Sequence, residues 1–251
     1  MINGESSLIG IFDSGIGGFS VLKEIKKTSN ADIFYFGDCA RAPYGNRDIE
    51  EIALFIKEII LYLKSKGVIH FVSACNSMSV LMTNKLLQEC NIEDFLYVDM
   101  IRAFKKYYDL PSSAKVLLIG TQATIHSNVY QNFLKEKTDT IFEYIPATLA
   151  GDIELNIGEE KLKEIIIPII SEAKNKGASH IVYGCTHYPL VHNVFQKCAD
   201  EIGWFGIFID PAIYVAQAVS EWDIPGNNIL TFETSKETKA FKRERDSLLN
   251  V

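Results

Sequence analysis

The sequence lacks the features that mark secreted and membrane proteins. Its five cysteines are odd in number and widely scattered, so they predict no disulfide framework and fit a reducing compartment. No apolar run approaches the ~20 residues that a membrane-spanning helix needs. The first residues, MINGESSLIGIF, have neither the basic start nor the long apolar core of a secretory signal. We therefore expect a cytoplasmic protein with no membrane partner.

The sequence also has no concentration of positive charge. The formal net charge is −7, and the most basic stretch, 236–245, is interleaved with acidic residues. Nucleic-acid binding depends on clustered lysine and arginine side chains that neutralise phosphates. We therefore expect no nucleic-acid partner and interpret 236–245 as a solvated helix face.

Motifs for metals and nucleotides are missing as well. No Gly-Lys-Ser/Thr phosphate loop and no C-x-x-C pair occurs, and Cys185 with His187 supplies too few ligands for zinc. No lysine motif for pyridoxal phosphate can be identified either. The sequence therefore predicts no metal and no cofactor.

What the chain does contain is a regular alternation of short apolar runs and amphipathic segments. Of its 251 residues 47% are hydrophobic and 23% charged, as in ordinary globular proteins. Strands are expected at 7–12, 32–36, 68–74, 115–119, 140–145, 179–183, 205–210 and near 228–233. Helices are expected at 17–29, 48–66, 78–90, 99–107, 124–137, 159–176, 188–202, 211–222 and 236–249. Such alternation predicts an α/β fold with mostly parallel sheets covered by helices.

One local pattern occurs twice. Residues 66–75 read KGVIHFVSAC and residues 176–185 read KGASHIVYGC, so Cys75 and Cys185 end matching segments that lie 185 − 75 = 110 positions apart. Helix, strand, helix and strand precede each cysteine. We infer two similar α/β domains, one formed by 1–97 plus the returning tail 210–251 and the other by 98–209.

Polar clusters follow the predicted strands. Parallel sheets bind ligands beyond the carboxyl ends of their strands, so two units that face each other would gather these clusters around one interdomain cleft. The residues concerned are Asp13, Ser14, Tyr44, Gly45, Cys75, Asn76, Ser77, Thr121, Cys185, Thr186 and His187.

The two strand-end cysteines carry the chemical hypothesis. A cysteine is often only a small buried hydrophobe, and we expect that role for Cys90 and Cys198. A thiolate is also an effective base. Two thiols on opposite sides of one carbon could remove a proton from one face and return one to the other, with Asp13 and His187 assisting.

Two other segments have simpler interpretations. The glycine-rich turn 13–18 either holds an ionic ligand group or is only a flexible turn. Pro43-Tyr44-Gly45 either walls the cleft or is only a rigid turn. The residues alone leave both alternatives open.

Several longer motifs resemble the cofactor-independent aspartate/glutamate racemase family, and within it the glutamate racemases. They run through nearly the whole chain: IGIFDSGIGGFSVL (9–22), YFGDCARAPYGNR (35–47), ACNSMS (74–79), GTQATIHSNVY (120–130) and GCTHYPL (184–190).

The resemblance implies two flavodoxin-like domains related by a pseudo-twofold axis, with the active site between them. It implies that Cys75 acts on D-glutamate and Cys185 on L-glutamate, assisted by Asp13 and His187. It further implies a homodimer that supplies D-glutamate for peptidoglycan. The substrate-holding residues would be Asp13, Ser14, Tyr44, Gly45, Asn76, Ser77, Thr121, Thr186 and His187.

The chain departs from the family pattern in a few places. Ser77 stands where threonine is usual, and Met78 replaces a small residue. The stretch 145–154 lacks the motif that is usual in the family, although Glu154 aligns best with a glutamate near the second base. Racemisation of aspartate or another amino acid, a thiol-dependent isomerase or decarboxylase, and a binding protein that kept the cleft are the alternatives.

Overall fold

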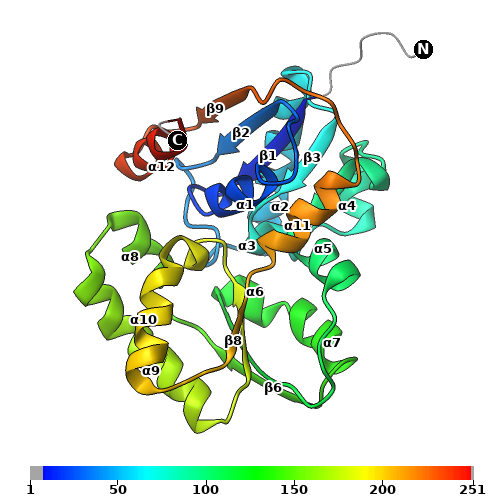
Figure 1. The fold of residues 1–251 in the computed structure, drawn as a ribbon. Coiled ribbons are helices and arrows are strands. Elements are labelled where there is room, and N and C mark those ends of the chain that lie inside the picture. The colour runs from blue at the N-terminus through cyan, green and yellow to red at the C-terminus, as the bar shows by residue number, and fades with distance from the viewer. Residues whose placement is uncertain (1–7, 250–251) are drawn as a thin grey trace.

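The structure, a computed structural model, describes residues 8–249. Its strands form two separate parallel sheets, which lie in the upper and lower halves of Figure 1. The first sheet has the order β4-β3-β1-β2-β9 and the second the order β6-β5-β7-β8. The strands are β1 (Ile9–Asp13), β2 (Ile33–Gly37), β3 (His70–Ser73), β4 (Tyr97–Asp99), β5 (Lys115–Gly120), β6 (Thr140–Tyr144), β7 (His180–Gly184), β8 (Ile207–Ile209) and β9 (Leu230–Thr234). The predicted α/β class with parallel sheets is confirmed.

The two sheets share one topology. If β5, β6, β7 and β8 are matched to β1, β2, β3 and β4 in turn, both sheets have the order fourth, third, first, second, and β9 is added at the edge of the first. Strands β3 and β7, each followed by one of the two cysteines, occupy equivalent positions next to the central strand. The repeat in the sequence is therefore a repeat of structure.

Helices cover both faces of each sheet. On the first sheet, α1 (Gly18–Ile25), α11 (Ala212–Ser220) and α12 (Lys239–Leu249) pack on one face, while α2 (Ile49–Ser65), α3 (Asn76–Ser79) and α4 (Asn84–Glu89) pack on the other. On the second sheet, α8 (Leu149–Leu155), α9 (Glu159–Asn175) and α10 (His192–Ile202) face α6 (Gln122–His126) and α7 (Val129–Lys135) across the strands. Short 3-10 turns occupy Asp94–Leu96 and Tyr188–Val191.

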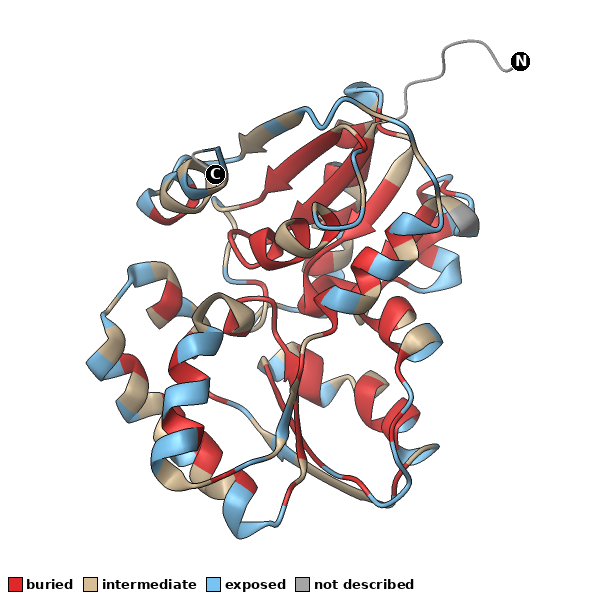
Figure 2. Cartoon of the chain, viewed as in Figure 1, coloured by how far each residue is buried: buried red, intermediate tan, exposed pale blue. Residues whose placement is uncertain are grey.

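Apolar side chains on both faces of the strands explain this layering. In β1, Ile9 and Ile11 enter the core beneath α1, whereas Phe12 enters the core beneath α2. Figure 2 shows strands β1 and β2 buried, the edge strand β9 mostly intermediate, and the outer turns of the helices exposed. A strand that is apolar on both faces has to be covered twice, which is why each sheet is sandwiched.

Helix α5 (Met100–Tyr107) packs against both halves. Met100 and Ala103 join the core of the first sheet, and Ile101 and Phe104 join that of the second. The division of the chain into 1–97 plus 210–251 and 98–209 stays a proposal, since this helix belongs to both cores.

Several expected boundaries differ from the structure. The sequence prediction missed β4 and α8, and the helices expected at 78–90 and 124–137 are each divided in two. Strand β4 has only three residues, too few for a periodic pattern. Asn128, which precedes α7, has a φ of 57°, and this left-handed residue separates α6 from α7.

The two halves approach each other closely at glycines of the first half. A Cβ atom on Gly17 would lie 2.3 Å from Thr186 Oγ1, and one on Gly45 would lie 2.8 Å from Thr121 Cβ. The backbone N–H of Ala123 also donates to the carbonyl of Gly45 at 3.0 Å. Only residues without a side chain fit at these two contacts.

Candidate active site

The predicted strand-end residues meet around one cavity of about 160 Å³ between the two halves. Its walls come from both sheets, and each chemical group lies just after a strand end. The sequence-predicted residues that line it are Ser14, Tyr44, Gly45, Cys75, Asn76, Ser77, Thr121, Cys185, Thr186 and His187. Asp13 does not line the cavity but lies buried directly behind it, since the side chain of Thr186 approaches Asp13 Oδ2 at 3.4 Å.

The first thiol follows β3. Cys75 is 6% exposed, and its Sγ donates to Ser14 Oγ at 3.6 Å. Burial, together with the nearby charge of Asp13, raises the pKa of Cys75 to about 12. Cys75 therefore rests as a protonated thiol, which is the form that delivers a proton.

Asp13 is the last residue of β1 and is fully buried. Its Oδ1 accepts the backbone N–H of Gly15 at 2.7 Å, which fixes the start of the glycine-rich turn. Burial raises the pKa of Asp13, and the charge of His187 counteracts part of this effect. The carboxyl group therefore keeps its proton to a higher pH than an exposed aspartate would.

The second thiol has a different environment. Cys185 Sγ lies 3.7 Å from His187 Nδ1, and His187 Nε2 lies 2.8 Å from Glu154 Oε1. Burial lowers the pKa of His187, but its contacts with Cys185 and Glu154 outweigh burial and raise that pKa well above the usual value. The imidazolium form of His187 is therefore favoured, which places a positive charge beside Cys185.

Hydroxyl and amide groups complete the cavity. Ser77 Oγ and Thr121 Oγ1 are 3.0 Å apart, so they join the two halves across the cavity. Tyr44 is held by a short hydrogen bond from its hydroxyl to Asp38. The hydroxyls of Ser77 and Thr121 suit a ligand that carries carboxylate oxygens.

Three residues that line the cavity were not among the site residues predicted from the sequence. Cys39 adds a third thiol to the cavity wall, and burial raises its pKa to about 11. Glu154 projects from the unpredicted helix α8, where only its position in a poorly matching stretch pointed to it. Gly151, also on α8, borders the same cavity.

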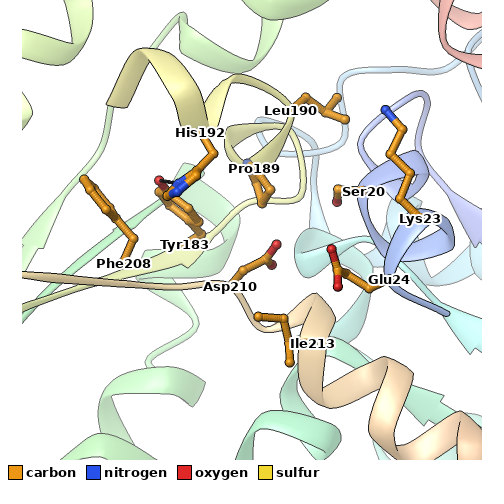
Figure 3. A pocket seen from close by; sticks show the side chains of 10 residues that line it. All are labelled: Ser20, Lys23, Glu24, Tyr183, Pro189, Leu190, His192, Phe208, Asp210 and Ile213. Carbon is orange, nitrogen blue, oxygen red and sulfur yellow. Dashed lines mark hydrogen bonds between the residues drawn. The ribbon is translucent and has the colours of Figure 1, made fainter. Parts of the chain in front are cut away.

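A larger cavity of about 340 Å³ lies elsewhere at the junction, between α1, α10 and the start of α11. Figure 3 shows the carboxylates of Glu24 and Asp210 pointing into it. Glu24 pairs with Lys27 at 2.6 Å, and Asp210 Oδ1 accepts the backbone N–H of Ala212 at 2.9 Å. Neither strand-end cysteine lines this cavity, whereas both line the smaller one.

Residues 8–249 show neither a metal site nor a membrane-spanning helix. No group of three or more His, Cys, Asp or Glu side chains in this range is arranged to hold a metal ion. Nor does any helix in this range combine the length and apolarity needed to cross a membrane.

Two matching parallel-sheet halves that enclose a cavity with a thiol from each half define the class of protein, a two-sheet α/β enzyme. The family model described as Asp/Glu/Hydantoin racemase matches residues 9–219. The chain belongs to this racemase family.

Curated relatives agree with this assignment. Glutamate racemase 3 of Caldanaerobacter subterraneus subsp. tengcongensis is 32% identical over 93% of this chain and 87% of its own length. The glutamate racemase of Aquifex aeolicus is 36% identical over 75% of this chain and 74% of its own length.

Solved structures show the same fold. A glutamate racemase of Bacillus anthracis superimposes with a TM-score of 0.85 at 26% identity, covering 99% of this chain and 96% of that one. The glutamate racemase of Francisella tularensis, solved with D-glutamate, gives a TM-score of 0.83 at 25% identity over 99% of this chain and 95% of that one.

Proposed function

We propose that this enzyme interconverts L- and D-glutamate without a cofactor, using Cys75 and Cys185 as its two acid–base groups. The observation that carries the proposal is that matching strands of the two halves each end in a thiol that borders the same cavity. The relatives named glutamate racemase, and the D-glutamate bound in one of the solved structures, support glutamate as the substrate.

The different surroundings of the two thiols support opposite roles for them, one as base and the other as acid. With L-glutamate, the Cys185 thiolate takes the Cα proton while the Cys75 thiol donates its own proton to the opposite face. The products are D-glutamate, a Cys185 thiol and a Cys75 thiolate, so protons and charges balance. Asp13 and His187 then return the thiols to their starting forms. D-glutamate follows the same path in reverse.

The substrate would be held by groups of both halves. Asn76, Ser77 and Thr121 offer amide and hydroxyl donors to carboxylates, and the acidic Asp13 lies behind Thr186, where it attracts an ammonium group. These fixed dipoles would also stabilise the negative charge that develops at Cα in a cavity closed to bulk water.

We also propose the cellular setting that the family resemblance implies. The enzyme would act in the cytoplasm as a homodimer, and its D-glutamate would be used for peptidoglycan. All five cysteines are free thiols, which supports a reducing compartment. Light scattering of the purified protein measures the oligomeric state, and a monomer at micromolar concentration would contradict the dimer.

The proposal is tested by incubating the enzyme with L- or D-glutamate in deuterium oxide without added cofactor. We expect interconversion from both sides, with deuterium at Cα of the newly formed enantiomer. Because the equilibrium constant of racemisation is 1, kcat/KM should be equal in the two directions. Turnover of aspartate with no reaction of either glutamate enantiomer would contradict glutamate specificity.

The same assay tests the two thiols. Cys75→Ala and Cys185→Ala should each abolish racemisation, since either change removes one of the two acid–base groups. Cys198→Ala is the matched control, because Cys198 is buried in the core of the second half away from the cavity. Near-normal turnover of either active-site variant would overturn the two-base mechanism.

A further inference from the structure

Asn76 lies directly after the first thiol and lines the cavity. Its side-chain oxygen accepts a hydrogen bond from the Tyr130 hydroxyl at 2.6 Å. Its side-chain nitrogen is buried and has no hydrogen-bond partner within residues 8–249. A buried N–H donor without a partner costs free energy, so it marks a position where a ligand acceptor belongs.

Tyr130 comes from the opposite half of the molecule. It lies in α7, which packs on the second sheet, whereas Asn76 begins α3 beneath the first. Tyr130 is 1% exposed and its ring packs against Phe104, so its hydroxyl is rigidly placed. Burial raises the pKa of Tyr130, so the hydroxyl keeps its proton and acts as a donor.

This hydroxyl decides the orientation of the Asn76 amide. If the amide were reversed, the Tyr130 proton would face an NH2 group and a buried donor would lose its acceptor. The cavity would then be lined by a carbonyl oxygen, which repels a carboxylate. With the oxygen held by Tyr130, the NH2 group is left for the substrate.

We propose that Tyr130 is a positioning residue that fixes the Asn76 amide with its NH2 group toward a carboxylate of the substrate. The inference rests on the proposed function, because it assumes a carboxylate substrate in this cavity. It adds a role for the second half in binding at the first thiol, through a residue that does not itself line the cavity.

The test replaces Tyr130 by phenylalanine. Tyr130→Phe keeps the ring and removes the donor, so KM for glutamate should rise about 5- to 30-fold, the range of one charge-assisted hydrogen bond lost in part. The kcat should change less than 3-fold, because both thiols stay in place. Tyr108→Phe is the matched control. Tyr108 also stacks on Phe104, but its hydroxyl has no hydrogen-bond partner in the described part of the chain.

Two further variants separate positioning from a general packing role. Asn76→Asp keeps an acceptor for Tyr130 but turns an oxygen toward the cavity, so KM should rise at least as much as in Tyr130→Phe. In an Asn76→Ala background, Tyr130→Phe should have no further effect on KM. Equal KM values for Tyr130→Phe and Tyr108→Phe, or additive effects in the double variant, would overturn the proposal.

Titration calorimetry with D-glutamate distinguishes failure of the inference from failure of the proposed function. If the wild type binds glutamate but does not racemise it, the proposed function is wrong, and the dissociation constants of the same variants still decide the role of Tyr130. If the wild type does not bind glutamate, both are wrong.

Discussion

At the scale of single residues, the two thiols are equivalent in the fold but not in their surroundings. Cys75 is bordered by Ser14 and the buried Asp13, whereas Cys185 is bordered by an imidazole that Glu154 holds. The first environment raises the pKa of the Cys75 thiol, whereas the second places a protonated imidazole beside Cys185. One duplicated position therefore has two different electrostatic surroundings, as the proposed two-base mechanism requires.

Glu154→Gln tests this asymmetry. The change removes the negative partner of His187, so the pKa of His187 falls and its imidazolium form is lost at lower pH. For L-glutamate we expect kcat to drop roughly 10- to 100-fold and its alkaline limb to move to lower pH. The control is Glu160→Gln, whose side chain is 86% exposed. An unchanged pH profile of kcat would contradict the role of Glu154.

At the scale of helices and strands, the C-terminal segment completes the first half. Strand β9 pairs with β2 in parallel, and Ser235, just after it, donates to Asp38 Oδ1 at 2.6 Å. Asp38 also accepts the hydroxyl of Tyr44 on the cavity wall. Residues near the end of the chain thus support the loop that forms one side of the active site.

Phe241 anchors this segment. It is 1% exposed, and its ring centroid lies 5.3 Å from that of Phe19 and 6.0 Å from that of Tyr35. Phe241→Ala should lower the free energy of unfolding by about 3–5 kcal/mol, because it leaves a cavity in the core. Phe205→Ala, at an 88% exposed side chain, should change it by less than about 0.5 kcal/mol. Urea denaturation measures both, and equal effects would contradict the anchoring role.

The sequence predicted the elements that have strong local patterns. The repeated strands before Cys75 and Cys185 could be located because a lysine-glycine helix end, an apolar run and a cysteine occur twice in the same order. Helix α8 has no such pattern, since Pro146 and Gly151 interrupt its segment. The contact of Tyr130 with Asn76 spans 54 positions and depends on how the halves pack, which no local pattern encodes.

At the scale of the whole molecule, the junction between the halves contains a carboxyl group whose charged form is destabilised by burial. Asp210 lies between β8 and α11, in the cavity of Figure 3. Burial, and then repulsion by Glu24, raises the pKa of Asp210 to about 7, although the backbone N–H of Ala212 partly stabilises the charge. This carboxyl group ionises more readily in the unfolded chain than in the folded one.

Asp210→Asn should therefore stabilise the protein in a pH-dependent way. As pH rises from about 4 to 7, the unfolded wild type gains its charge first and the folded state loses relative stability. The variant avoids this loss, so we expect a gain of roughly 1–4 kcal/mol at pH 8 that shrinks toward zero at pH 4. Denaturant unfolding at the two pH values measures it. The control, Asp109→Asn at a 94% exposed side chain, should show no such trend. A pH-independent effect of Asp210→Asn would contradict the shifted pKa.

The glycine contacts between the halves have a consequence for inheritance. Gly17 and Gly45 belong to the first half, but the atoms that forbid a side chain there, on Thr186 and Thr121, belong to the second. Recombination that joined the first half to a diverged second half would keep the cavity only if both surfaces still matched. The two halves share one topology, but each shapes the contact surface of the other. We therefore expect the halves to be inherited and exchanged as one unit.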